Sequence, residues 1–393
     1  MDPEAGAPTV SAVGGPRVAV IGGGQLARMM QPAAVALGVP LRVLVEGPDV
    51  AAAQVVRDPV VGDHLDLDDL RSVARDCTVV TFDHEHVPPE HLTTLSEEGH
   101  ACRPGPHALL FAQDKGAMRR RLTELGTPAP RHRTVSAIED LDTFAAEVGW
   151  PLVLKTLRGG YDGKGVFLVE APSEAQTLLD QHGTLLAEER VDFSRELSAL
   201  VARSPSGQIA AYPVVESVQR DGVCAEVTCP APGLHPDLAV HAQRIAMDLS
   251  AALDVVGVLA VEMFETRDGR VLVNELAMRP HNTGHWSIDG AVTSQFENHL
   301  RAVLDLPLGD PSPRARWTCM VNVLGGEVDG LYDGYPHVLA RDPGARVHLY
   351  GKPVRPGRKV GHVTTYGDDL DDVRERARHA AAWFRGDLLA EED

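Results

Sequence analysis

The sequence has 393 residues, which is long enough for two or three domains with a sizeable core. Lys and Arg number 37 and Asp and Glu 56, and the formal net charge of -19 argues against a nucleic-acid or anionic-membrane surface. The five cysteines are scattered and no apolar run reaches about 18 residues, so we expect a protein of the reducing cytoplasm without a membrane span.

The first part of the chain predicts a parallel β-sheet. Residues 1–16 are rich in Ala, Gly and Pro and contain no Lys or Arg, so we expect a disordered extension instead of a secretory signal. Buried strands are predicted at residues 17–21, 41–45 and 78–82, and a helix is expected over residues 25–37. Strands that alternate with helical stretches indicate a βαβ layer, which we expect to end near residue 110.

A glycine-rich turn joins the first strand to the first helix. Gly22, Gly24 and Ala27 match the spacing of the dinucleotide fingerprint, and Glu46 supplies an acid about twenty residues on. The bare backbone at a helix N-terminus would accept any phosphate or carboxylate. The sequence leaves three interpretations open: a nicotinamide cofactor, a sugar phosphate or another anionic substrate, and a purely structural turn.

A smaller unit with a second glycine-rich loop follows. It is preceded by a predicted helix at 109–125 and a linker at 126–130, and it is expected to contain helices at 138–148 and 173–181 and strands at 152–155, 166–169 and 185–188. Lys155 ends the first of these strands, and the loop from Gly159 to Gly165 follows it. A strand-borne Lys and loop N–H groups can hold phosphates, and a plain flexible hairpin is the alternative.

The most informative stretch is a predicted hairpin of two strands, residues 258–265 and 271–275, around an Asp-Gly turn. Because side chains alternate along a strand, Glu262 and Glu275 can face each other across this hairpin. Two carboxylates on one face suit a magnesium ion that holds nucleotide phosphates, and a solvated sheet face is the alternative. Three polar residues, Arg279, His281 and Asn282, follow directly in a loop.

Residues 194–276, which include the hairpin, are expected to be mostly strands with one helix at 237–254. A charged segment lies just before this region. The strand that leads into this region ends in Glu188, Glu189, Arg190 and Val191. Such a strand can present backbone amide and carbonyl groups to an adenine edge, with Glu196 on the ribose. A charged strand edge fits the residues equally well.

A basic cluster stands out near the end of this acidic chain. A Pro-rich break at 306–313 precedes a last section that is expected to contain strands and one helix. Within it, Arg355, Arg358 and Lys359 lie in a loop that Pro and Gly constrain. Three cations within five residues suit one phosphate or carboxylate group, and a solvated turn is the alternative.

Together these segments resemble the ATP-grasp superfamily and, within it, the family of 5-(carboxyamino)imidazole ribonucleotide synthases. The resemblance runs from residue 17 to about residue 366 and rests on the motifs Gly22-Gly-Gly-Gln-Leu-Ala-Arg-Met-Met30, Thr81-Phe-Asp-His-Glu-His-Val87, Gly159-Gly-Tyr-Asp-Gly-Lys-Gly165, Asn274-Glu-Leu-Ala-Met-Arg-Pro-His-Asn-Thr-Gly-His-Trp286 and Arg355-Pro-Gly-Arg-Lys-Val-Gly-His362. It implies an α/β (α+β) ATP-grasp fold. We expect an N-terminal βαβ substrate domain (17–110), an ATP-grasp domain (111–305) with a lid at about 127–190 and a large antiparallel sheet, and a C-terminal domain (306–393).

The resemblance also implies roles for individual residues. ATP contacts would come from Lys115, Lys155, the loop residues Gly159, Gly160, Tyr161, Asp162, Gly163, Lys164 and Gly165, the adenine segment Glu188, Glu189, Arg190 and Val191, and from Glu196, Gln219, Asn274 and Glu275. Glu262 and Glu275 would hold Mg2+, with Mn2+ as a substitute. Aminoimidazole ribonucleotide would bind to Gln25, Leu26, Glu85, Tyr161, Asp162, Arg358 and Lys359. Arg279, His281 and Asn282 would hold bicarbonate and carboxyphosphate, and Asp162 would accept a proton from the amine.

Two positions depart from the family pattern. The family usually has Pro where this chain has Met278, just before Arg279. It usually has a His near the nucleotide where this chain has Gln219, which can donate a hydrogen bond but cannot carry charge.

The implied activity is the ATP-dependent joining of bicarbonate to aminoimidazole ribonucleotide in purine biosynthesis, by a cytoplasmic homodimer with no nucleic-acid or membrane partner. Phosphorylation of bicarbonate to carboxyphosphate supplies the leaving group that bicarbonate lacks. The nearest alternative is another ATP-grasp ligase, such as the formate-dependent glycinamide ribonucleotide transformylase. A nicotinamide-dependent dehydrogenase would leave the two glutamates and the lid loop without a role, and a non-catalytic nucleotide sensor would leave the Arg-Pro-His-Asn loop without one.

Overall fold

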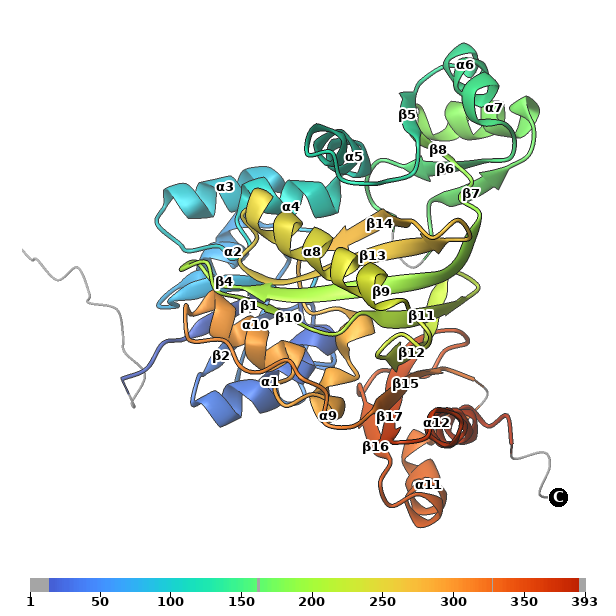
Figure 1. Ribbon diagram of the computed structural model, residues 1–393. Coiled ribbons are helices and arrows are strands. Elements are labelled where there is room, and N and C mark those ends of the chain that lie inside the picture. The colour runs from blue at the N-terminus through green and yellow to red at the C-terminus, as the bar shows by residue number, and fades with distance from the viewer. Residues whose placement is uncertain (1–13, 161–162, 327, 389–393) are drawn as a thin grey trace, which may run out of the picture.

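Three β-sheets organise the chain, as the ribbon diagram shows (Figure 1). The structure is a computed structural model, and it describes residues 14–160, 163–326 and 328–388. Two sheets have four strands each, in the orders β3-β2-β1-β4 and β5-β8-β6-β7, and the third has nine. Within the described residues, no helix is long and apolar enough to cross a lipid bilayer.

The N-terminal sheet is parallel throughout, which confirms the predicted βαβ layer. Its strands are β1 (Val18–Ile21), β2 (Leu41–Val45), β3 (Asp58–Val61) and β4 (Val79–Phe82), and the helices α1 (Gln25–Leu37), α2 (Leu67–Ala74) and α3 (Pro89–Glu97) accompany them. Every residue of β1 and β4 is buried, as expected for a sheet with helices on both faces. β3 escaped prediction because its Asp-Pro start and its half-exposed side chains give no continuous apolar run.

The helix predicted at 109–125 is wrong in one respect, because it is two helices, α4 (Pro106–Gln113) and α5 (Lys115–Glu124). Asp114 between them has extended backbone angles, and its carboxylate accepts a hydrogen bond from the Ala117 N–H. It therefore acts as the N-cap of α5, and Lys115 becomes the first residue of that helix.

The second four-stranded sheet forms the small unit, drawn in green away from the rest of the molecule (Figure 1). It consists of β5 (His132–Val135), α6 (Ile138–Val148), β6 (Leu152–Thr156), β7 (Val166–Val169), α7 (Pro172–His182) and β8 (Leu185–Glu189). These elements bury a hydrophobic cluster of their own, with Leu141 and Phe144 of α6 against Leu152 and Leu154 of β6. A separate core allows the unit to act as one body over the large sheet.

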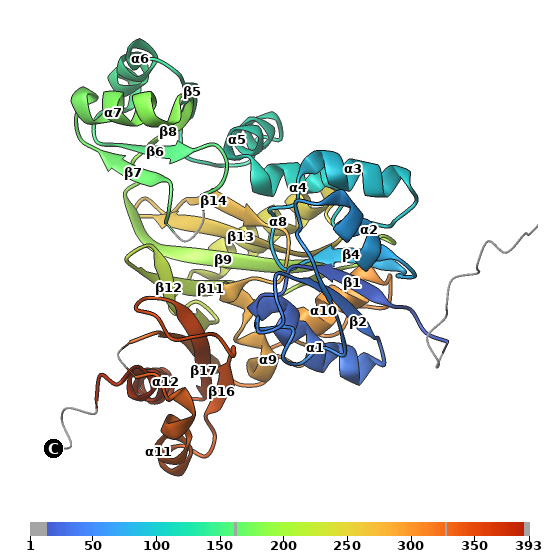
Figure 2. The same cartoon turned by 180° about the vertical axis from the view of Figure 1, so that it is seen from behind.

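The nine-stranded sheet has the order β14-β13-β9-β11-β12-β15-β17-β16, with β10 beside β9. Its strands other than β10 and β15 are labelled in Figure 2. Its strands are β9 (Phe193–Arg203), β10 (Ile209–Ala211), β11 (Val215–Arg220), β12 (Val223–Cys229), β13 (Gly257–Thr266), β14 (Val271–Ala277), β15 (Trp317–Leu324), β16 (Arg346–Leu349) and β17 (Lys359–Gly367). All the recorded pairings in this sheet are antiparallel, as predicted for the large sheet.

Helices and short turns flank the large sheet: α8 (Pro236–Ala252), η1 (Asn282–Gly284), α9 (Ser287–Gly290), α10 (Gln295–Val303), η2 (Leu331–Gly334), α11 (Tyr335–Arg341) and α12 (Leu370–Arg385). Phe296 and Leu300 of α10 share a hydrophobic cluster with Met29 and Met30 of α1, so α10 joins the parallel sheet to the large one. The section after residue 313 was expected to contain one α-helix, but its described residues contain two, α11 and α12.

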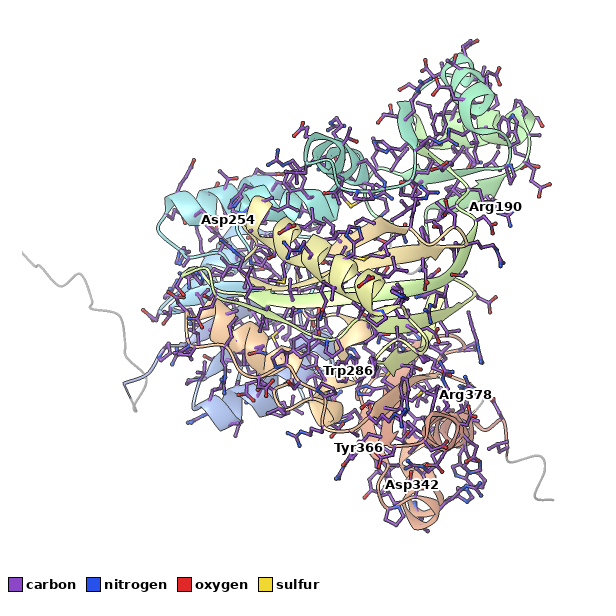
Figure 3. The ribbon with its side chains drawn as sticks, in the orientation of Figure 1. Arg190, Asp254, Trp286, Asp342, Tyr366 and Arg378 are labelled. Carbon is purple, nitrogen blue, oxygen red and sulfur yellow. The ribbon has the colours of Figure 1, made fainter. Side chains whose placement is uncertain are left out.

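Ion pairs fix α12 to the large sheet and to the segment after α11, and Figure 3 labels one partner of each pair, Arg378 and Asp342. Arg378 of α12 makes a two-pronged contact with the buried Glu226 of β12, at 2.6 and 2.9 Å. Arg376 of the same helix pairs with Asp342, which follows α11, at 2.9 Å. Bidentate Arg–carboxylate pairs of this kind add geometric specificity as well as energy.

Candidate active site

The two glutamates of the hairpin are paired across β13 and β14, with Glu262 directly opposite Glu275. Lys115 at the start of α5 lies 2.7 Å from Glu275. Burial, then the charges of Glu275 and Glu196, raise the pKa of Glu262 to about 8. A nearby cation would favour the ionised form of such a carboxylate, so the pair of glutamates fits a hard divalent ion such as Mg2+.

A buried ion cluster lies behind the hairpin. Lys155 of β6 donates to the Asn274 amide oxygen at 3.0 Å and contacts Glu188 at 2.8 Å, while Arg119 of α5 lies 2.5 Å from Glu188. Burial opposes the charge of Glu188, but Arg119 and Lys155 outweigh it and lower the pKa to about 2. The Glu188 carboxylate is therefore already paired with Arg119 and Lys155. At residues 188–191, the groups that could hydrogen-bond a nucleobase are the backbone N–H and C=O groups.

Arg119 had no place in the sequence prediction. Its side chain is 1% exposed and also donates to the carbonyl oxygens of Val273 and Asn274, at 3.1 and 2.8 Å. It therefore ties α5 to both β8 and β14. Three consecutive arginines, 119 to 121, gave no signal as to which of them points inward.

The glycine-rich loop between β6 and β7 has a tight backbone. A Cβ on Gly160 would lie 2.6 Å from the Lys164 carbonyl oxygen, so only glycine fits there. Gly163 and Gly165 have φ of 76° and 72°, in the left-handed region. Tyr161 and Asp162, which were assigned to both ATP and the ribonucleotide, lie outside the described residues.

A cavity of about 1390 Å³ opens between the small unit and the large sheet. It brings together most of the predicted site residues: Glu85, Lys115, Lys155, Gly159, Gly160, Gly163, Glu188, Glu189, Arg190, Val191, Glu196, Gln219, Glu262, Asn274, Glu275, Arg279, His281, Asn282 and Lys359. Lys164 and Gly165, which follow on the same loop, are not among its lining residues. Residues from every section of the chain thus meet at one hollow.

Glu196 and Gln219 lie at the far side of this cavity, on β9 and β11. Burial raises the pKa of Glu196, and a hydrogen bond from Gln219 partly offsets this effect. Gln219 also donates to the Ser217 hydroxyl at 2.9 Å. The amide at this position therefore holds the carboxylate in place without adding a charge.

Glu85, which follows β4, reaches Arg279 on the loop after β14. The two side chains lie 2.7 Å apart, and the same carboxylate accepts the Met278 N–H at 3.2 Å. Met278 itself is completely buried. A proline at position 278 would lack this N–H, so the departure from the family pattern adds a hydrogen bond instead of removing one.

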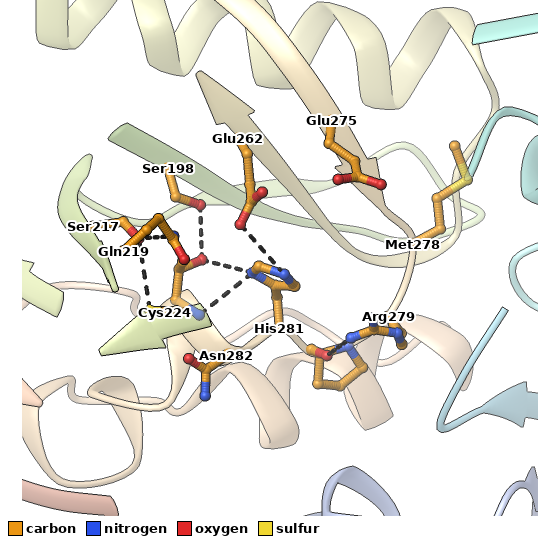
Figure 4. A network of polar contacts seen from close by, with 12 residues as sticks. Ser198, Ser217, Gln219, Cys224, Glu262, Glu275, Met278, Arg279, His281 and Asn282 are labelled. Carbon is orange, nitrogen blue, oxygen red and sulfur yellow. Dashed lines mark hydrogen bonds and ion pairs between the residues drawn. The ribbon is translucent and has the colours of Figure 1, made fainter. Parts of the chain in front are cut away.

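His281 is the centre of a chain of polar contacts (Figure 4). Its Nδ1 lies 2.8 Å from the Thr283 hydroxyl, which in turn lies 2.8 Å from the Ser198 hydroxyl, and the Thr283 N–H donates to Nδ1 at 3.4 Å. A backbone N–H can only donate, so Nδ1 is the acceptor and the proton is assigned to Nε2, 3.6 Å from Glu262. Burial, then Arg279 and Lys359, hold the pKa of His281 well below its usual range.

Asn282 points away from His281 and the two glutamates in the same view (Figure 4). It is 8% exposed, and its amide meets the amide of Asn322 on β15. The sequence prediction had Asn282 holding bicarbonate and gave no role to Asn322, which lies in an ordinary apolar strand.

A second cavity of about 490 Å³ lies between the N-terminal sheet and the loop before β17. Cations line one side of it, Lys352, Arg355 and Arg358, and the Gly23–Gly24 turn lines the other. Lys352, which was not predicted, lies 2.5 Å from the Gln25 side-chain oxygen. Of the residues assigned to the ribonucleotide, Arg358 lines this cavity and Gln25 contacts its Lys352, whereas the Leu26 side chain is buried in the core.

The N-terminus of α1 is already filled by a side chain of the protein. Asp83, which follows β4, accepts hydrogen bonds from the Gly24 and Ala27 N–H groups at 3.1 and 2.7 Å. A Cβ on Gly24 would approach Asp83 to 2.2 Å. The glycines of this turn thus admit the Asp83 carboxylate, which takes two of the N–H groups at this helix end.

Glu46, His64 and His84 also bring three possible ligand atoms within 4.8 Å of one another. The Nδ1 of His84 accepts the His86 N–H at 3.2 Å, which assigns the ring proton to Nε2. A protonated Nε2 has no free lone pair for a metal ion, so Glu46, His64 and His84 do not provide three metal ligands.

Comparison with known proteins supports the geometry. Three family models match: the ribonucleotide synthetase preATP-grasp domain at residues 16–113, the ATP-grasp domain at 120–296 and the phosphoribosylaminoimidazole carboxylase C-terminal domain at 318–376. The N5-carboxyaminoimidazole ribonucleotide synthase of Mycobacterium bovis is 55% identical over 96% of this chain and 90% of its own, and that of Corynebacterium ammoniagenes is 50% identical over 96% and 94%.

Solved structures agree with these sequence relatives. An N5-carboxyaminoimidazole ribonucleotide synthetase in complex with ADP superposes with a TM-score of 0.87 at 35% identity, covering 94% of this chain and 97% of that one. The N5-carboxyaminoimidazole synthase of Aspergillus clavatus, in complex with ADP and 5-aminoimidazole ribonucleotide, gives 0.85 at 31% identity, with coverage of 94% and 98%.

Proposed function

The chain belongs to the N5-carboxyaminoimidazole ribonucleotide synthase family of ATP-grasp ligases, and from this we propose how its residues carry out the reaction. It joins bicarbonate to the exocyclic amine of 5-aminoimidazole ribonucleotide while ATP becomes ADP and phosphate, a step of purine biosynthesis. The carrying observation is the single cavity in which the paired glutamates, two lysines and the Arg279–His281 loop meet. The formate-dependent transformylase remains without support.

Nucleotide binding is assigned to the side of the cavity under the small unit. Lys115 and Lys155 neutralise the phosphates, the main chain of residues 188–191 meets the adenine, and Glu196 binds the ribose. Glu262 and Glu275 hold Mg2+, which supplies positive charge to the phosphates when it is bound. The glycine-rich loop covers the phosphates and excludes water.

Bicarbonate is assigned to the loop after β14. A bicarbonate oxygen attacks the γ-phosphorus and ADP leaves, which forms carboxyphosphate. The ribonucleotide amine then attacks the carboxyl carbon, phosphate leaves, and the amine gives up a proton. Arg279, fixed by Glu85, and the Nε2–H of His281 both donate hydrogen bonds to the oxygens that carry the charge. Asp162 is proposed as the proton acceptor.

The ribonucleotide is assigned to the junction of the two cavities. Its phosphate suits the second cavity, where Lys352, Arg355 and Arg358 converge, and Lys359 lines the first cavity beside the reacting groups. An aminoimidazole ring between them would lie close to Glu85. Binding of the substrate across both cavities explains why the C-terminal section carries cations in this acidic chain.

The remaining assignments are proposals of the same kind. We assign domains to residues 17–110, 111–305 and 306–393, a homodimer as the assembly, the cytoplasm as the location, and Mn2+ as a substitute metal. A sedimentation measurement tests the homodimer.

The decisive experiment is ADP formation by the purified protein with ATP, Mg2+, bicarbonate and aminoimidazole ribonucleotide. We expect turnover to require the last two compounds, and formate with glycinamide ribonucleotide not to replace them. Glu275→Ala should abolish turnover, because the metal pair would lose one ligand; retained activity would remove the magnesium assignment.

A further inference from the structure

Asn282 and Asn322 form a closed pair of amides beneath the active-site loop. The Asn282 Nδ2 donates to the Asn322 Oδ1 at 3.1 Å, and the Asn322 Nδ2 donates back to the Asn282 Oδ1 at 2.8 Å. Asn322 is 1% exposed and lies on β15, opposite His362 of β17. The contact thus joins the loop after β14 to the far part of the large sheet, forty residues along the chain.

A third contact fixes the direction of both amides. The Asn322 Nδ2 also donates to the Cys224 carbonyl oxygen at 2.8 Å. A carbonyl oxygen can only accept, so Nδ2 of Asn322 must face Cys224, and its Oδ1 must face the Asn282 Nδ2. Both hydrogens of the Asn322 amide are therefore used, and the orientation of Asn282 follows from that of Asn322.

The neighbours of Asn282 are clamped in the same way from other elements. Gln295 of α10 accepts the His281 N–H at 2.8 Å and donates to the His281 carbonyl oxygen at 2.7 Å. Ser198 of β9 lies against the Thr283 hydroxyl. Each of residues 281, 282 and 283 thus has its own buried support, and the imidazole of His281 is what remains directed toward the cavity.

We infer that Asn322 is a positioning residue for the bicarbonate step, because its amide pair with Asn282 holds the loop that presents Arg279 and His281. The inference rests on the proposed function, and it reassigns Asn282 from a bicarbonate ligand to an anchor. It gives the last section of the chain a second task besides binding the ribonucleotide. A site held by packed and hydrogen-bonded supports is pre-organised, and a small displacement of such a site costs rate.

Asn322→Asp tests the inference with almost no change in shape. The carboxylate of this variant can still accept the hydrogen bond from the Asn282 amide. It cannot donate to the Cys224 carbonyl oxygen or to the Asn282 Oδ1, so both of those hydrogen bonds are lost. We expect kcat/KM for bicarbonate to fall by about tenfold to a hundredfold, with ADP affinity, measured by calorimetry, unchanged. We also expect ATP hydrolysis without the ribonucleotide to rise relative to carboxylation, because carboxyphosphate is less well held.

Asn298→Asp is the matched control. Asn298 is fully buried, its Nδ2 donates to the Tyr212 hydroxyl and the Gly309 carbonyl, and its Oδ1 accepts the Gly309 N–H, away from the cavity. Asn298→Asp should lower the melting temperature about as much as Asn322→Asp does, yet leave the KM for bicarbonate unchanged. If Asn322→Asp does not fold, Asn322→Ser, which keeps one donor, is expected to show the same bicarbonate defect.

The outcomes separate the possibilities. Asn282→Ala, Asn322→Ala and the double variant should be equally defective in bicarbonate use, because the two amides act as one unit. A normal KM for bicarbonate in the Asn322 variants, with a raised one in Asn282→Ala, would overturn the inference and return Asn282 to the ligands. An unmodified protein that makes no ADP from these substrates would instead overturn the proposed function.

Discussion

His281 shows how much one residue depends on its immediate partners. An imidazole that is neutral has two tautomers, and only the one with its proton on Nε2 can donate a hydrogen bond into the cavity. The Thr283 N–H and hydroxyl both lie on the Nδ1 side, and the N–H, which can only donate, selects this tautomer. In the proposed mechanism His281 is therefore a hydrogen-bond donor to an anionic oxygen, because a protonated Nε2 cannot take the proton of the amine.

Thr283→Val tests this assignment. Valine keeps the branched shape and the backbone N–H but removes the hydroxyl that faces Nδ1. Loss of this hydrogen bond leaves the imidazole less firmly held, so we expect kcat to fall by about tenfold to a hundredfold. The retained backbone N–H should keep the proton on Nε2 in the 15N spectrum of His281. Thr283→Ser should restore activity, and a 15N spectrum with the proton on Nδ1 would contradict the assignment.

Arg119 offers a second test at the scale of one side chain. Arg119→Met leaves Glu188 buried with only Lys155 as a cation, and loss of one partner from a buried ion pair typically costs about 3–5 kcal/mol. Chemical denaturation should therefore show a large drop in the free energy of unfolding. Arg120→Met, on the exposed side of the same helix, is the matched control and should change stability little.

Residue types predicted the groups that line the cavity, but not the groups that support them. Charged residues at strand ends, such as Lys155 and Glu275, could be recognised because the turn and strand signals lie close to them in sequence. Arg119 and Asn322 could not, because their roles depend on partners 69 and 40 residues away. Their own neighbourhoods read as an ordinary helix and an ordinary apolar strand.

At the scale of elements, strand and helix types followed from periodicity, whereas the ends depended on single capping residues. Asp114 divides the helix predicted at 109–125 because its carboxylate caps α5. Asp83 looked like the simple end of a strand, yet it caps α1 from across the sheet. In both cases an acidic side chain satisfies helix N–H groups, and in the second case the sequence separation hides it.

α10 contributes a buried histidine that joins two sheets. The His299 Nε2 lies 2.8 Å from the Thr81 hydroxyl of β4, and its Nδ1 accepts the Val258 N–H of β13 at 3.1 Å. Burial lowers the pKa of His299 to about 3. Because the folded state binds this proton less readily than the unfolded state, the stabilisation is complete above the unfolded pKa, near 6.5, and is lost as the pH falls toward 3.

His299→Gln should therefore flatten the acid side of the stability profile. Between pH 6.5 and 4 the unmodified protein should lose up to about 1.4 kcal/mol more per pH unit than the variant, the limit for one proton. Denaturation curves at several pH values measure this difference. His241→Gln, at an exposed position of α8, should keep the slope of the unmodified protein.

At the scale of the whole molecule, the second cavity, which we propose as the ribonucleotide phosphate site, joins the first and last parts of the chain. Gln54 donates to the Gly351 carbonyl at 2.8 Å, and Lys352, which lines the second cavity, contacts Gln25. A ligand in this cavity should stabilise both parts together, since any ligand that binds only the folded state raises its stability.

Aminoimidazole ribonucleotide should accordingly raise the melting temperature, and Lys352→Met should reduce that rise because one phosphate contact is lost. The shift caused by ADP serves as the internal control, and it should be the same in both proteins. An unchanged ribonucleotide shift in Lys352→Met would exclude the second cavity as the phosphate site.

The pairing of β12 with β15 has a consequence for how such chains can be divided. Four residue pairs, from Glu226 with Val321 to Cys229 with Thr318, carry the large sheet across the Pro-rich break at 306–313. A fragment that stops at this break would keep β12 with one side bare, and an unpaired strand edge invites aggregation. Chimaeras between relatives should therefore exchange β15 to β17 together with the strand β12 that pairs with β15. The Pro-rich break at 306–313 is a poor place to divide the chain.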